Sequence, residues 1–365
     1  MSQGPTDPTA LHLDGVMLPS GERTGVWISD GRVSYTPIDG AVTIATDVWI
    51  MPGLVDAHCH IGLGADGAVS AEVAEQQAIT DRNAGTLLIR DAGSPIDTHW
   101  LDEQADKPRL IRAGRHIARP KRYIRNFAAE VEPDQLVAEV ARQAVRGDGW
   151  VKLVGDWIDR EVGDLAPLWP YEVAKAAIDE AHRLGARVTA HCFEEESVQQ
   201  LVRAGVDGIE HGTGLDADTI ELMAQRQVAL VPTLINLENF PIFAEAGRAK
   251  FPRYATHMRA LHERRRQTIG AAIEAGVPVY AGTDAGGTLP HGLISSEIGL
   301  LSELGGAEFA LGAASWRARQ WLGAQAAGDG ESADLVVYAA DPRLVPAVTA
   351  HPALVILRGE VVARA

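Results

Sequence analysis

The hydrophobic pattern divides the chain into a long middle part and two short ends. In the middle part, short continuous apolar runs alternate with stretches of helical periodicity, which is the pattern of parallel βα units. The apolar runs predict eight strands: Val55–His60, Thr86–Asp91, Leu110–Arg115, Trp150–Asp156, Arg187–Cys192, Gly208–His211, Ala229–Leu234 and Pro278–Asp284. The helical stretches between them include Glu72–Asn83, Asp134–Val145, Tyr171–Leu184, Asp218–Gln227 and Met258–Ala275.

The number and length of these units predict an α/β fold. Eight βα units over roughly 270 residues have the size of a (β/α)8 barrel of the TIM type. An open, doubly wound sheet would need a glycine-rich nucleotide-binding loop after an early strand, and the sequence has none. We therefore expect a barrel.

The two ends of the chain carry short alternating runs separated by turns. These runs are Ala10–Leu18, Gly25–Thr36 and Val42–Trp49 at one end, and Asp334–Tyr338 and Leu354–Val362 at the other. Such alternation is typical of half-buried strands. We expect residues 1–50 and 330–365 to form one small β-sandwich domain, which leaves residues 51–329 for the barrel.

Charge and composition argue against several classes of protein. The 33 lysines and arginines against 49 acidic residues give a net charge of −16, which argues against a general binder of nucleic acid or of anionic membranes. The first residues resemble no signal peptide, no long apolar segment could span a membrane, and two cysteines cannot form a disulfide framework. We expect a soluble cytoplasmic protein that acts on a small molecule; homo-oligomerisation stays open.

Candidate chemical groups follow the predicted strands at their carboxyl ends, where barrel enzymes carry their active sites. The first strand ends in Asp56-Ala57-His58-Cys59-His60. A spacing of two places His58 and His60 on one face and Cys59 on the other. Two adjacent imidazoles suit a borderline metal ion such as zinc.

Lys152 stands out because the chain has only five lysines and this one lies inside the apolar run Trp150–Val154. A buried ammonium is costly unless it is neutral, paired or modified. A neutral amine can react with CO2 to give a carbamate, an anionic group whose two oxygens can bridge two metal ions. Alternatively, Lys152 reaches the barrel rim or pairs with Asp156.

Three further candidates end later strands. His191 ends the fifth strand, His211 the sixth and Asp284 the eighth. Each taken alone could be a hydrogen-bonding core residue or, for Asp284, a helix cap. Their occurrence at one rim together with His58, His60 and Lys152 favours a metal centre over six separate structural roles.

These motifs resemble the amidohydrolase superfamily of metal-dependent hydrolases. The similar segments are PGLVDAHCH, the strand-four lysine, TAHC, IEHG, GTDAG, ADLVVYAADP and VILRGEVV. The segments VKLVGD, HCF and IEHG are most similar to those of the imidazolonepropionase-like and Xaa-Pro dipeptidase-like branch.

The resemblance implies a site with two divalent metal ions, with zinc as the default. His58, His60 and Asp284 would hold the more buried ion, His191 and His211 the second, and carboxylated Lys152 would bridge them. It implies hydrolysis of a C–N amide, peptide or cyclic amide bond by a bridging hydroxide. Asp284 would be the catalytic proton shuttle.

Other functions stay open on the sequence. His191-Cys-Phe-Glu194 is similar to deaminase-type relatives, so a mononuclear deaminase of a cyclic amidine that uses Glu194 is the alternative, although Glu194 could instead begin a helix. A barrel that has lost its chemistry is a third class, against which the six retained ligands argue.

Substrate contacts are expected from two loops. The basic loop 116–125 offers Tyr123 and Arg125 for a substrate carboxylate, and His291 lies on the loop after strand eight. Loop 116–125 lacks the Gly-Gly-His motif that we would expect from the most similar branch. We expect Cys59 and Cys192 to be buried small hydrophobic residues.

Overall fold

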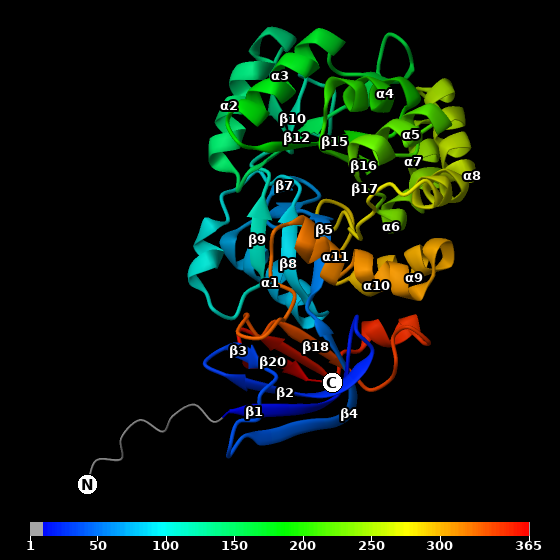
Figure 1. Cartoon of the computed structure of the whole chain (residues 1–365). Coiled ribbons are helices and arrows are strands. Elements are labelled where there is room, and N and C mark those ends of the chain that lie inside the picture. Colours follow the sequence, from blue (N-terminus) through cyan, green and yellow to red (C-terminus); the bar gives the residue numbers. More distant parts are fainter. Residues whose placement is uncertain (1–9, 365) are drawn as a thin grey trace.

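The middle of the chain forms a barrel of parallel strands surrounded by helices in the computed structural model, which describes residues 10–364 (Figure 1). One wall consists of three hydrogen-bonded strands, β5 (Leu54–Cys59), β8 (Thr86–Asp91) and β9 (Arg109–Arg112). The other wall contains β11 (Ala129–Glu130), β10 (Ile117–Ala118), β12 (Trp150–Val154), β15 (Arg187–Cys192), β16 (Gly208–His211) and β17 (Ala229–Val231). The expected α/β barrel is confirmed.

Irregular segments close the barrel at two places. Between β9 and β12, the chain bends and joins β12 through the pair Ile117 and Leu153. Between β17 and β5, residues 278–285 pair only at Val279, with Leu230, and at Ala285, with Cys59. The predicted strand Pro278–Asp284 therefore lies in the expected place without a regular ladder.

Close approach explains the irregularity before Asp284. A Cβ atom on Gly282 would lie 2.7 Å from the Cβ atom of His58, so only glycine allows the two backbones to approach in this way. Asp284 itself has a φ of 57°, in the left-handed region. This backbone turn directs the Asp284 side chain toward the histidines.

Most predicted elements occur with small shifts in their bounds. Three strands, β8, β15 and β16, have the predicted limits. β12 ends two residues early because Asp156 begins the hairpin of β13 (Asp156–Asp159) and β14 (Asp164–Pro167), and β17 ends at Val231 because Thr233 is left-handed. The corresponding helices are α1 (Ala71–Asn83), α2 (Leu136–Arg146), α3 (Tyr171–Arg183), α5 (Ala217–Arg226) and α8 (Pro252–Glu274).

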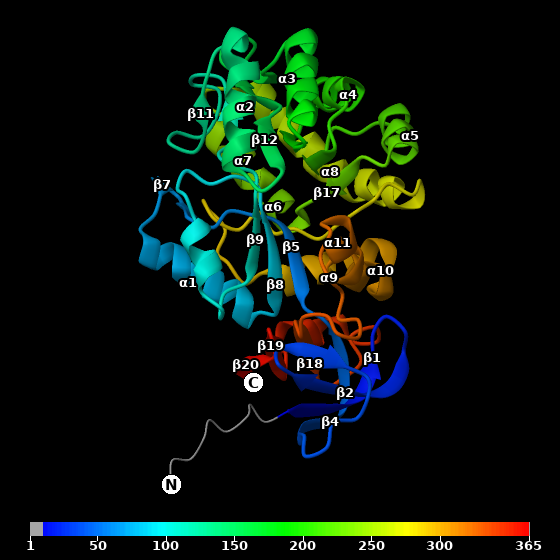
Figure 2. The ribbon, with the colours of Figure 1, turned by 60° about the vertical axis from the view of Figure 1, so that its left-hand side comes forward.

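The remaining α-helices follow later strands (Figure 2). They are α4 (Glu195–Ala204), α6 (Leu234–Leu237), α7 (Phe240–Gly247), α9 (Ile294–Gly305), α10 (Ala307–Ala313) and α11 (Trp316–Trp321). The short helix α6 matters most for the site, because it lies directly after β17.

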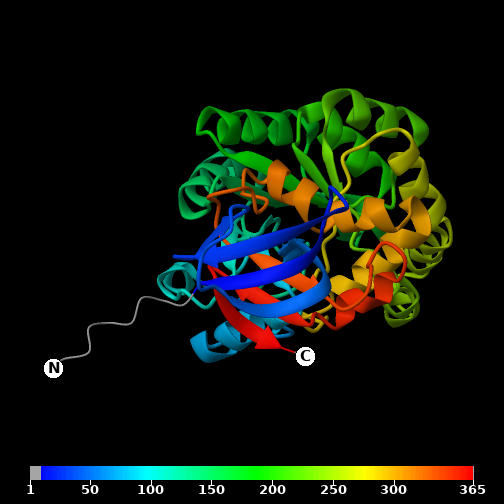
Figure 3. The same ribbon diagram turned by 60° about the horizontal axis from the view of Figure 1, so that its bottom comes forward.

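The two ends of the chain meet in one mixed sheet of seven strands, in the order β20-β19-β18-β4-β1-β2-β3. Figure 3 shows this sheet beside one end of the barrel. Its strands are β1 (Leu11–Met17), β2 (Glu22–Ser29), β3 (Arg32–Ser34), β4 (Val42–Pro52), β18 (Leu335–Tyr338), β19 (Leu354–Leu357) and β20 (Glu360–Arg364).

The sheet has an apolar core of its own, to which both chain ends contribute, for example Leu13, Ile50 and Ile356. β4 leads through Gly53 directly into β5 and so links the sheet to the barrel. The expected pairing of the chain ends is present, while the domain limits 1–50 plus 330–365 stay a prediction.

None of the helices within residues 10–364 combines the length and apolarity that a membrane span requires. The expectation about a signal peptide falls mainly on residues 1–9, which lie outside the described residues.

Candidate metal centre

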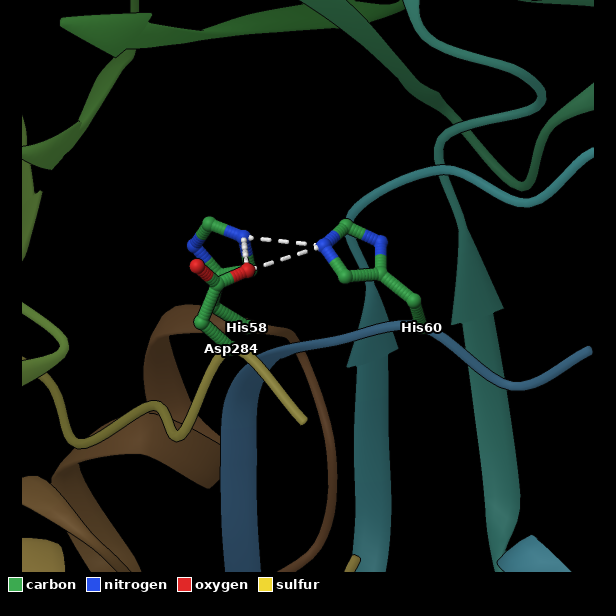
Figure 4. A group of neighbouring side chains, drawn as sticks. All are labelled: His58, His60 and Asp284. Carbon is green, nitrogen blue, oxygen red and sulfur yellow. Dashed lines mark hydrogen bonds and ion pairs between the residues drawn. The ribbon is translucent and has the colours of Figure 1, made fainter. Parts of the chain in front are cut away.

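The side chains of His58, His60 and Asp284 converge at the carboxyl end of β5 (Figure 4). The two histidine Nε2 atoms are 3.3 Å apart. Asp284 Oδ1 lies 3.1 Å from Nε2 of His58 and 3.0 Å from Nε2 of His60. Three ligand atoms from two distant parts of the chain thus point at one spot.

The outer nitrogen of each histidine shows which inner atom carries a lone pair. Nδ1 of His60 lies 2.7 Å from the Gly93 carbonyl oxygen, which can only accept, so this nitrogen donates. Nδ1 of His58 donates in the same way to Glu210, at 2.7 Å. In these neutral tautomers both Nε2 atoms are acceptors that face a carboxylate. A cation between them resolves the repulsion, so this donor set fits a divalent metal ion such as zinc.

The charges around His58, His60 and Asp284 also favour a bound cation. Burial acts to raise the pKa of Asp284, but the neighbouring His58 and His60 hold it well below its usual range. Burial and the charge of Lys152 act to lower the pKa of His58, but the carboxylates of Glu210 and Asp284 outweigh them and raise it. A proton and a metal ion therefore compete for His58, so metal binding weakens as the pH falls.

Glu210 on β16 is the residue that orients His58, and the sequence analysis did not single it out. It is fully buried, accepts from Arg90 NH2 at 2.5 Å and also accepts from the Thr189 hydroxyl. Burial acts to raise the pKa of Glu210, but Arg90 and His58 hold it well below its usual value. The available signal was a charged residue inside the apolar run that ends at His211.

We expect Glu210→Gln to lower metal affinity by about 10- to 100-fold, because outer partners of ligand histidines have effects of this size. The amide would no longer be an ionised acceptor for both His58 and Arg90. Competition with a chromophoric chelator measures the affinity. Glu139→Gln is the matched control, since Glu139 is buried on α2 and bonds Gln143, away from the histidines. Equal affinities of the two variants would contradict this role of Glu210.

His191 and His211 lie next to the first group. The ring centroid of His211 is 5.3 Å from that of His58 and 4.7 Å from that of His191. Nδ1 of His211 lies 2.7 Å from the Thr233 hydroxyl, and Nε2 of His191 is buried with no hydrogen-bond partner among the described residues. Burial lowers the pKa of His211 to about 3, so its nitrogen is free to bind a metal ion.

Lys152 on β12 is buried in the same region. The charge of Lys152 acts to lower the pKa values of His58, His191 and His211. Among residues 10–364, its ammonium forms no hydrogen bond and no ion pair. Burial lowers its own pKa to about 8. The alternative pairing with Asp156 is absent, because that carboxylate instead accepts from Phe193 N at 2.8 Å and from the Ser197 hydroxyl at 2.6 Å.

A cavity of about 330 Å³ opens above these groups and includes His60, His191 and Asp284 in its lining. Tyr123 lines it as well, 5.6 Å from His191 between ring centroids, and burial together with Asp284 raises the pKa of its hydroxyl. The structure thus brings one of the three expected substrate-binding residues to the site.

The other two lie elsewhere. Arg125 is exposed and lines an adjoining groove with Lys121 and Arg160, and Tyr123 lines both this groove and the cavity. His291 is 2.8 Å from Asp81 on α1 and does not line the cavity.

Glu194 does not face the metal ligands. It is the N-cap of α4, and its two carboxylate oxygens accept from the backbone nitrogens of Glu196 and Ser197, both at 2.8 Å. The structure therefore supports the helix-cap interpretation. Both cysteines are free and buried, as expected, and Cys59 faces Asp81 on the helix side of β5.

Asn236 on α6 is a second residue that the sequence analysis missed. Its Nδ2 atom donates to Asp284 Oδ2 at 2.7 Å and so fixes the outer oxygen of that carboxylate. Buried Glu297 accepts from the nitrogens of Leu234 and Ile235 and holds α6 in place. No motif marks Asn236, because its contact depends on how α6 folds back over the rim.

Comparison with known proteins gives consistent results. The sequence model described as Amidohydrolase family matches residues 49–362. An uncharacterized protein of Mycobacterium tuberculosis strain H37Rv is 59% identical over 351 residues, 96% of this chain and 95% of its own length.

Solved structures with the same fold include a Xaa-Pro dipeptidase with methionine bound in its active site. It has a TM-score of 0.80 and 22% identity, and the match covers 97% of this chain and 99% of that one. Ochratoxinase of Aspergillus niger has a TM-score of 0.77 and 18% identity, over 98% of this chain and 96% of that one.

Proposed function

This chain belongs to the amidohydrolase family and is a hydrolase that acts on carbon–nitrogen bonds; from this premise we propose that it cleaves an amide bond at a centre of two divalent metal ions. The cleaved bond is an amide, peptide or cyclic amide, and the name Xaa-Pro dipeptidase indicates peptide cleavage for one protein of the same fold.

One observation carries the proposal: five uncharged or anionic donors and an unpartnered buried lysine surround the floor of one cavity. His58, His60 and Asp284 would hold the first ion, and His191 and His211 the second. Lys152, once carboxylated by CO2, would present an oxygen to each ion. This modification also removes the cost of a buried cation without a partner.

Bound divalent ions, zinc by default, supply Lewis acidity that makes a water nucleophilic near neutral pH and polarises a carbonyl oxygen. Residues of the chain itself orient the metal ligands. Glu210 and the Gly93 carbonyl keep His58 and His60 in one tautomer and orientation. These contacts hold the ligand atoms in place before the substrate arrives.

Asp284 is the group that moves the proton. Its pKa is held low, so the carboxylate is ionised and can accept a proton from the attacking water. Asn236 holds one carboxylate oxygen through a hydrogen bond while the other oxygen faces the histidines. The same oxygen can then deliver the proton to the leaving nitrogen as the C–N bond breaks.

The deaminase alternative has less support. It depends on Glu194 as a proton-transfer group, and both oxygens of Glu194 are bound to the start of α4. It also leaves the burial of Lys152 unexplained.

Metal removal and reloading test the proposal. Protein reloaded with Zn²⁺ or Mn²⁺ in bicarbonate is expected to hold about two ions per chain and to hydrolyse members of a panel of amides, dipeptides, ureas and cyclic amides. Chelation should abolish this activity. One ion per chain with release of ammonia from cyclic amidines would favour the deaminase, and no bound metal would contradict both.

A further inference from the structure

The wall of the cavity above the metal centre is apolar and largely aromatic. Loop 116–125 and the residues after it contribute Tyr123, Ile124 and Phe127, β13 contributes Trp157 and Ile158, and α7 contributes Phe243. Trp157 packs edge-on against Tyr123, with 4.8 Å between ring centroids. These contacts form a continuous apolar surface on which a ring can pack.

The described residues that line this cavity include no arginine or lysine, and the acidic residue among them is Asp284. The other polar side-chain groups are imidazoles, the indole N–H of Trp157, the amide of Asn236 and the hydroxyls of Tyr123, Tyr254 and Thr288. A carboxylate seated against this wall would therefore lose its hydration without gaining an ion pair, which is costly. The metal ligands are at the floor, where the scissile carbonyl has to bind.

The basic residues of the neighbouring loop have other contacts. Arg122 forms an ion pair with Asp159 at 2.7 Å, and Arg115 donates to the Phe127 carbonyl at 2.9 Å. Arg125 lines an adjoining outer groove, which shares Tyr123 with this cavity but does not place Arg125 in its lining. The expected recognition of a substrate carboxylate by Arg125 thus has no counterpart in this cavity.

We propose that the substrate is an amide whose group in this cavity is uncharged and apolar, preferably a ring, rather than a dipeptide or an N-acyl amino acid with a free carboxylate there. This inference rests on the proposed amide hydrolysis and adds the substrate class. A volume of about 330 Å³ lies at the small end of ligand pockets and accommodates a ring with a short linker.

A pair of matched substrates tests the inference. N-benzoylphenethylamine and N-benzoylphenylalanine share the amide and both rings, and differ by the α-carboxylate. With metal-loaded protein, kcat/KM for the neutral amide is expected to exceed that for the acid by about 100-fold or more. Equal values, or a preference for the acid, would overturn the inference and leave amide hydrolysis intact.

An added cation should reverse part of this preference. Ile124 lines the cavity and its side chain is 38% exposed, so Ile124→Arg can place a guanidinium at the mouth without disturbing the core. We expect it to raise the acid-to-neutral ratio of kcat/KM by about tenfold. Val145→Arg is the control, because Val145 is 83% exposed on α2 and lies outside the cavity. Equal ratios for the two variants would count against the inference.

Binding measured without turnover separates this inference from the proposed function. The same pair is titrated by calorimetry into metal-loaded Asp284→Asn protein, where cleavage is blocked. This variant lacks the one carboxylate of the cavity lining, which in the wild type would repel the acid. Tighter binding of the neutral amide even by this variant therefore supports the inference. If the neutral amide binds more tightly but the wild-type protein cleaves neither compound nor any amide of the panel above, amide hydrolysis is wrong and the assigned cavity preference stands. Tighter binding of the acid overturns the inference.

Discussion

Lys152→Ala protein is expected to retain fewer than the two metal ions per chain of the wild type under equal loading and to lose about 10³-fold or more in kcat/KM. The side chain is buried beside the histidines, and within residues 10–364 its ammonium forms no hydrogen bond and no ion pair. If its carbamate bridges the two ions, its removal takes one ligand from each. Metal content is measured by mass spectrometry of the dialysed protein.

The fold of this variant should survive, because the substitution removes a buried cation and breaks no hydrogen bond of the lysine. Lys175→Ala is the matched control, since the Lys175 side chain on α3 is 44% exposed and pairs with Asp179 at 2.8 Å. It should retain the metal content and activity of the wild type.

The carbamate has a direct signature. Wild-type protein loaded in ¹³C-bicarbonate should show a carbamate carbon resonance that Lys152→Ala protein lacks, and its reactivation should speed up with bicarbonate. Two retained metal ions with normal turnover in Lys152→Ala protein would remove Lys152 from the centre. Loss of metal from Lys152→Ala protein, together with no carbamate signal in the wild type, would leave Lys152 as an unmodified structural residue.

Asp284→Asn is expected to retain much of the bound metal but to lose about 10³-fold in kcat, the upper part of the range for general acid–base groups. The amide has nearly the shape of the carboxylate but cannot accept a proton at neutral pH. His58 and His60 still present their nitrogens and the Lys152 carbamate would still present an oxygen, so the first ion keeps three of its four proposed ligands. The comparison of kcat with metal content under saturating metal separates the two effects.

Asp216→Asn provides the control for this substitution. Asp216 is the N-cap of α5 and accepts from Thr219 N at 2.8 Å, a role that asparagine fills equally well. Its kcat should equal that of wild type. Near-normal turnover of Asp284→Asn protein with intact metal would refute the proton-shuttle role.

Much of the candidate site was predictable because its candidate ligands lie at strand ends. The alternation of side chains along a strand is local, so the placement of His58 and His60 on one side of β5 follows from their spacing alone. The apolar runs located β8, β15 and β16 with the observed limits, and the order of βα units predicted the barrel that brings the carboxyl ends together.

Contacts between distant segments were not predictable in the same way. Glu210 reaches His58 across the barrel, and Asn236 reaches Asp284 from a four-residue helix after a left-handed Thr233. Arg125 and His291 lie near candidate motifs along the chain, yet one faces an outer groove and the other bonds Asp81. Loop conformation and side-chain packing decide such positions, and neither has a periodic signal.

The sequence by itself determined the barrel and the set of candidate metal ligands, because hydrophobic period and strand alternation act over a few residues. Only the tertiary structure decided which carboxylate orients His58, which amide holds Asp284, and that the cavity wall is apolar. These features arise where segments far apart in sequence pack against one another, so the basic loop that suggested an anionic substrate contributes Tyr123 and Ile124 to the cavity instead of its charges.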